Sequence, residues 1–160
     1  MNKKQLIIAW VVLIMFFSCV NFSFAEIGRS IAEFETSKFI SVYKPNEKTS
    51  RILSTGNKAY LYKFTGIYTP ASIEIVLGKD DRIEKQTFLS GFYNAPSATL
   101  LSIMLAFVYE SSGGKINLDD FNSALATAKE KGEVLSGFNV KITFMPEIER
   151  VKMIVVTISQ

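Results

Sequence analysis

The residues of this sequence that are best suited to chemistry are a Ser–Lys pair and several neighbouring carboxylates. Ser112 and Lys115 are separated by two glycines, which is the S-x-x-K spacing that lets a lysine amine deprotonate a serine one helical turn away. In that arrangement the serine begins a helix, whereas Ser112 follows a helical pattern and two glycines do not favour a helical turn. A loop that ends a helix therefore explains the motif, and a Ser/Lys-dependent hydrolase is the alternative.

The carboxylates have local explanations of the same kind. A glycosidase needs two carboxylates across a cleft at a defined separation. Asp80 and Asp81 stand in a polar segment typical of a turn, and Asp119 and Asp120 stand where they complement the positive end of a helix. A small carboxylate-dependent envelope hydrolase remains an alternative that the sequence leaves open.

Absences narrow the chemistry further. The chain has no His, and its single Cys, Cys19, lies near the N-terminus. This removes the commonest general base, both usual types of zinc ligand and, beyond residue 25, the thiol nucleophile. The acidic residues lack EF-hand spacing, and the glycines match no nucleotide-binding fingerprint. We therefore expect a non-enzymatic protein with no cofactor and no metal.

The N-terminus has the layout of a secretory signal. Lys3 and Lys4 precede an apolar run from Leu6 to Val20, and a Ser-Phe-Ala sequence ends at Ala25. We predict cleavage after Ala25, which leaves one domain at residues 26–160 in the bacterial periplasm or outside the cell. The alternatives are a membrane anchor formed by the uncleaved segment from Leu6 to Val20, or lipidation at Cys19.

The charge balance excludes one class of partner. Without Lys3 and Lys4, 16 basic residues face 15 acidic ones, a net charge of +1. Proteins that bind nucleic acid need a broad basic surface to neutralise phosphates. Nucleic acid is therefore not an expected partner, and membrane contact is expected only through the leader.

Most of the remaining chain alternates as β-strands do. We predict a strand over residues 38–44, a turn over KPNEKTS, and two short strands on either side of Gly56 and Asn57. Tyr60, Tyr62 and Phe64 would share the core side of one strand. SIEIVL and RIEKQTFL form a hairpin, and a second hairpin with a turn over residues 146–150 closes the chain.

Two helical patterns separate these hairpins. One follows Pro96 and ends near Ser112, and the other follows Asn117 as N-cap and ends before Gly132. Leu118 is expected in the buried stripe of the second helix. Strands in hairpins with helices in one block predict an α+β fold, a single domain in which two consecutive helices pack on one face of a largely antiparallel sheet.

Two similar segments supply the candidate binding site. TGIYTPAS (residues 65–72) and SGFYNAPS (residues 90–97) each place a Gly, a large apolar residue and a Tyr where a strand is expected to end. Connections are exposed in general, and Tyr is enriched at recognition surfaces. Ile67, Tyr68, Phe92 and Tyr93 are therefore the candidate binding residues, although one aromatic residue of each pair could instead fold back to close the end of the sheet.

Together these features predict an exported binding or accessory protein that recognises a protein or an envelope component. An immunity-type or inhibitor protein directed against a toxin or wall enzyme is one alternative. The hydrolases above are another, and a structural homo-oligomer joined through the aromatic face or a strand edge is a third.

Overall fold

The computed structural model describes residues 26–65, 70–93, 96–126, 133–148 and 150–159. The predicted leader, residues 1–25, lies outside the described residues. No helix within the described ranges is long and apolar enough to cross a membrane.

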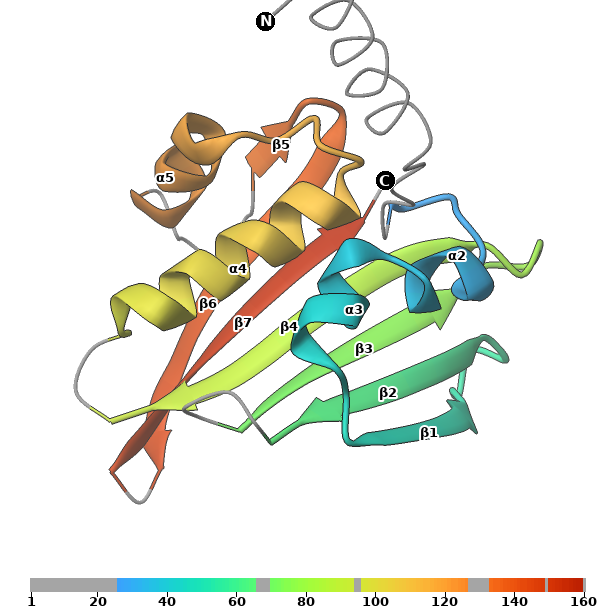
Figure 1. Cartoon of the computed structure of the whole chain (residues 1–160), viewed down its shortest axis with the longest axis horizontal. Helices are drawn as coiled ribbons and strands as arrows, with labels where there is room; N and C mark the ends of the chain where they lie inside the picture. The colour runs from blue at the N-terminus through green and yellow to red at the C-terminus, as the bar shows by residue number, and fades with distance from the viewer. Residues whose placement is uncertain (1–25, 66–69, 94–95, 127–132, 149, 160) are drawn as a thin grey trace, which may run out of the picture.

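The described residues form four helices and seven strands, whose arrangement can be followed in Figure 1. The helices are α2 (Ile31–Glu35), α3 (Lys38–Tyr43), α4 (Ala98–Ser111) and α5 (Leu118–Ala126). The strands are β1 (Glu47–Ile52), β2 (Lys58–Phe64), β3 (Ala71–Leu77), β4 (Ile83–Phe92), β5 (Glu133–Leu135), β6 (Phe138–Ile148) and β7 (Val151–Ser159).

The strands form one antiparallel sheet in the order β1-β2-β3-β4-β7-β6-β5. The predicted hairpin of β3 and β4 and the C-terminal hairpin of β6 and β7 are both present. The α+β fold with a largely antiparallel sheet is therefore confirmed. The C-terminal hairpin has a shorter turn than predicted, because β6 continues through Pro146 to Ile148 past a register irregularity.

The helices cover one face of the sheet, and the core lies between them (Figure 1). Alternate residues of the strands point to this face, among them Tyr62, Phe64 and Phe88. Phe107 of α4 packs on Phe88 with ring centroids 5.6 Å apart and on Phe39 of α3 at 6.2 Å. We call the opposite face, which these helices leave uncovered, the open face.

Residues 38–43 form helix α3, so the strand predicted there is wrong. The hydroxyl of Ser37 caps the helix by accepting a hydrogen bond from the backbone N–H of Ile40. Phe39 and Tyr43, four residues apart, bring their rings to 4.6 Å. The cap and this packing outweigh the β-propensity of the segment.

The turn predicted over KPNEKTS is also wrong, because β1 begins at Glu47. All six residues of β1 are exposed, so no apolar alternation reveals the strand. An ion pair between Glu47 and Lys63 supports its pairing with β2, and one between Arg51 and Glu74 reaches across to β3. Leu118 is likewise exposed rather than buried, and Phe121 and Ala124 are the buried residues of α5.

A polar cluster fastens α2 to the sheet. The hydroxyl of Tyr62 donates to Oε1 of Glu35 at 2.7 Å, and the ammonium of Lys48 also donates to that oxygen. Burial alone would raise the pKa of Glu35, but the hydrogen bonds from Lys48 and Tyr62 outweigh it and lower that pKa. Burial, together with the bond to Glu35, raises the pKa of Tyr62.

This cluster predicts a specific loss of stability in acid. Because the folded state lowers the pKa of Glu35 below its usual value near 4.5, the carboxylate stabilises the fold above that pH, and the contribution is lost as the pH falls below it. The free energy of unfolding should therefore fall more between pH 6 and pH 3 for the wild type than for Glu35→Gln. Urea denaturation followed by circular dichroism measures both, and equal slopes would contradict the assignment.

Candidate functional site

Ser112 and Lys115 are each held by a structural partner. The Ser112 side chain is buried, and its hydroxyl donates to the carbonyl of Tyr109 at 3.0 Å and accepts from the N–H of Ile116 at 3.0 Å. The ammonium of Lys115 donates to Oε1 of Glu26 at 2.8 Å. These bonds close the end of α4 and fasten the start of the described chain, so the S-x-x-K spacing has a structural explanation.

The candidate carboxylates also serve local structure. Oδ1 of Asp80 accepts from the N–H of Arg82 within the β3–β4 turn, and Oδ2 of Asp120 accepts from the N–H of Asn117 at the start of α5. The N–H and hydroxyl of Ser30 lower the pKa of Glu33 in a capping box at α2. No group of three or more His, Cys, Asp or Glu among the described residues could hold a metal ion.

The described residues of the two similar sequence segments lie at the same end of the sheet. Ala71 at the start of β3 pairs with Ser90 near the end of β4, and each residue belongs to one of these segments. The hydroxyl of Ser90 donates to the carbonyl of Pro70 at 3.3 Å and links them directly. Ile67 and Tyr68 lie outside the described residues, so only Phe92 and Tyr93 of the candidate residues can be placed.

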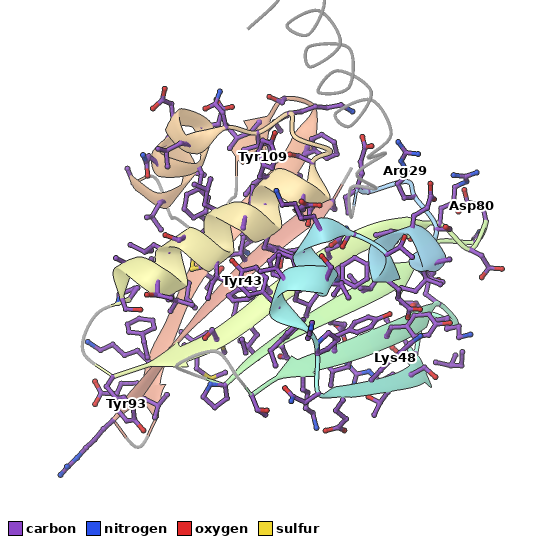
Figure 2. All side chains as sticks on the ribbon, viewed as in Figure 1. Arg29, Tyr43, Lys48, Asp80, Tyr93 and Tyr109 are labelled. Atoms are coloured by element: carbon purple, nitrogen blue, oxygen red, sulfur yellow. The ribbon has the colours of Figure 1, made fainter. Side chains whose placement is uncertain are left out.

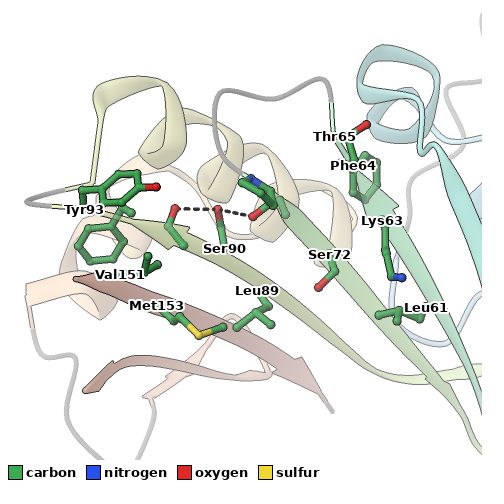
Figure 3. Close-up of a pocket in the computed structure, with 14 residues that line it drawn as sticks. Leu61, Lys63, Phe64, Thr65, Ser72, Leu89, Ser90, Tyr93, Val151 and Met153 are labelled. Atoms are coloured by element: carbon green, nitrogen blue, oxygen red, sulfur yellow. Dashed lines mark hydrogen bonds between the residues drawn. The ribbon is translucent and has the colours of Figure 1, made fainter. Parts of the chain in front are cut away.

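A groove of about 440 Å³ lies between these segments on the open face (Figure 3). Strands β2, β3, β4 and β7 form its floor. It is lined by Leu61, Lys63, Phe64, Thr65, Pro70, Ala71, Ser72, Leu89, Ser90, Gly91, Phe92, Tyr93, Val151 and Met153. The volume falls within the range of about 300–1,000 Å³ that is typical of small-molecule sites.

The strand that precedes SGFYNAPS continues into it: Ser90, Gly91 and Phe92 belong to β4, and Tyr93 follows the strand. Gly91 points to the open face, where a Cβ atom would lie 3.0 Å from Cγ1 of Val151. The missing side chain deepens the groove and lets Val151 approach. Tyr93, with 67% of its surface exposed, forms the rim.

Phe92 also lines the groove, but its ring is buried and not exposed as the sequence predicts. It alternates with Gly91 and so points to the helix-covered face, where it is 5% exposed and meets Phe144 edge-on at 6.3 Å. One aromatic residue of this segment thus closes the core, as the structural interpretation of the motif proposes, and the other is available at the surface.

Lys63 is the charged residue that lines the groove. Its ammonium lies 3.0 and 3.1 Å from the two carboxylate oxygens of Glu47 on the neighbouring strand. Both side chains are about half exposed, 48% for Lys63 and 49% for Glu47. Exposed pairs of this kind are worth about 0–1 kcal/mol, so the pair opens at little cost.

A second hollow of about 470 Å³ lies between α3 and α4, and no sequence pattern indicated it. It is lined by Lys38, Phe39, Val42, Tyr43, Ala106, Tyr109 and Glu110. Figure 2 shows Tyr43 and Tyr109 on these helices, on the side of the molecule opposite the open face. Burial raises the pKa of the Tyr43 hydroxyl above its usual value.

Comparisons of the chain with protein families, with curated proteins and with solved structures gave no significant match.

Substitutions at Phe92 and Tyr93 should separate the structural residue from the surface one. Phe92→Ala should lower the free energy of unfolding by about 3–5 kcal/mol, because it removes a buried ring. Tyr93→Ala should change it by less than about 0.5 kcal/mol, because the ring is exposed. Urea denaturation of the two variants checks both values, and similar losses in the two would contradict this division of roles.

Proposed function

We propose that the chain is an exported, non-enzymatic binding protein that recognises a protein or an envelope component through the groove on the open face. The observation that carries the proposal is that the described residues of both similar segments line one groove at the same end of the sheet, with Tyr93 on its rim. The signal-like leader supports export.

The residues that a hydrolase would use are engaged in hydrogen bonds that hold the local structure. Ser112 bonds to backbone groups on both sides, and Lys115 bonds to Glu26. Asp80 and Asp120 accept hydrogen bonds from the backbone of their own turns. These arrangements favour binding over a Ser/Lys or carboxylate hydrolase.

Crosslinking in intact envelopes tests the proposal. The full chain, tagged at its C-terminus, is compared with Tyr93→Ala and with Tyr109→Ala, a matched control on α4 whose ring is also exposed. We expect a partner that is recovered with the wild type and with Tyr109→Ala and lost with Tyr93→Ala, because only Tyr93 borders the groove.

The other outcomes would indicate a different binding site or a different function. Equal recovery with all three chains would contradict the groove as the site. Recovery of a toxin or wall enzyme in the Tyr93-dependent fraction would make the chain an inhibitor. Turnover of wall glycans that Ser112→Ala abolishes in a folded variant would replace binding by hydrolysis.

A further inference from the structure

The groove on the open face has a polar end and an apolar end. One end is lined by an ammonium and two hydroxyls. They belong to Lys63 in β2, Thr65 just after β2, and Ser72 in β3. Leu89, Val151 and Met153, from β4 and β7, line the other end with aliphatic carbon. Figure 3 shows Lys63 and Thr65 at the side of the groove away from Tyr93 and Val151.

The strand register fixes the direction of this gradient. Lys63 pairs with Ser72, Ser72 with Leu89, and Leu89 with Val155, so one row across four strands runs from charged to apolar. Adjacent strands lie about 4.8 Å apart, which makes this row roughly 14 Å long. In the next row Gly91 pairs with Met153. Because Gly91 has no side chain, it leaves space in the groove beside the apolar residues.

We propose that the groove binds a single unbranched acyl chain that ends in a carboxylate. The carboxylate lies at Lys63 and Ser72, which pair across β2 and β3 and offer hydrogen-bond donors, and the chain runs over Gly91 towards Met153. The inference rests on the groove being the site of the proposed function, and it names the ligand that the site takes.

Shape and charge favour this occupant over others. Of the two kinds of partner proposed above, an envelope component suits the groove better, because about 440 Å³ is the size of a small-molecule site. A row of roughly 14 Å with a donor-rich end and an aliphatic end suits an extended amphipathic chain better than a compact ring. Lys63 supplies the positive charge, and Glu47, which now holds it, competes with an anionic ligand.

Methionine methyl groups provide a direct test. Met153 lines the groove, whereas Met104 is fully buried between α4 and the helix-covered face. The full chain is expressed with residues 1–25 in place, labelled with ¹³C at the methionine methyls, and purified as the cells deliver it. Dodecanoate, kept below its micelle concentration, is then titrated, and Met153→Leu assigns the groove signal.

We expect the Met153 signal to shift and saturate at one dodecanoate per chain while the Met104 signal stays in place. Lys63→Gln should weaken dodecanoate binding about fivefold, as the loss of an exposed ion pair predicts. Glu47→Gln should strengthen it by a similar factor. Neither substitution should alter the binding of dodecanol, which has no charge.

The proposal is wrong if Met153 does not respond, if Met104 responds equally, or if Lys63→Gln leaves dodecanoate binding unchanged. A response to anionic phospholipid vesicles without one to dodecanoate would also overturn it, because the ligand would then be a membrane surface. If dodecanoate fails while Tyr93→Ala still loses a crosslinked partner, the ligand class is wrong and the proposed binding function stands.

Discussion

The structure depends on a sheet that is covered on one face only. Antiparallel strands turn alternate residues to opposite faces, so each strand of this sheet makes both a core surface and an outer one. On the covered face the contacts of Phe107 with Phe88 and Phe39 join α4, β4 and α3 in one core. On the open face, β1, β2 and β3 carry paired charges, and β4 and β7 carry the aliphatic residues of the groove.

This alternation explains how four consecutive residues acquire different roles. Ser90 and Phe92 face the helices, one fastening Pro70 and the other filling the core. Gly91 faces outward and keeps the groove deep, and Tyr93 leaves the strand at its rim. A one-residue shift of β4 would exchange the two sets and remove both the core contact and the groove.

The parts of this fold that local pattern predicts are those whose apolar residues recur at a regular period. The alternation of Ile73, Ile75 and Leu77 is enough to identify β3, and Asn117 caps α5 as its position in the sequence indicates. Strand β1 has no such period, because every one of its residues is exposed and its ion pairs reach α2, β2 and β3. Local pattern does not predict the groove either, because the groove depends on the register that sets Ala71 opposite Ser90.

The described chain begins at the end of the sheet that is opposite the groove. The N–H of Ile27 donates to the carbonyl of Ser111, and that of Gly28 donates to the carbonyl of Ile83 at the start of β4. Strand β4 then runs ten residues, about 30 Å, to Phe92 beside the groove. Figure 2 shows Arg29 and Tyr93 at opposite ends of the molecule. A leader that stayed anchored or lipidated would therefore display the groove away from the bilayer, with strand β4 as the spacer.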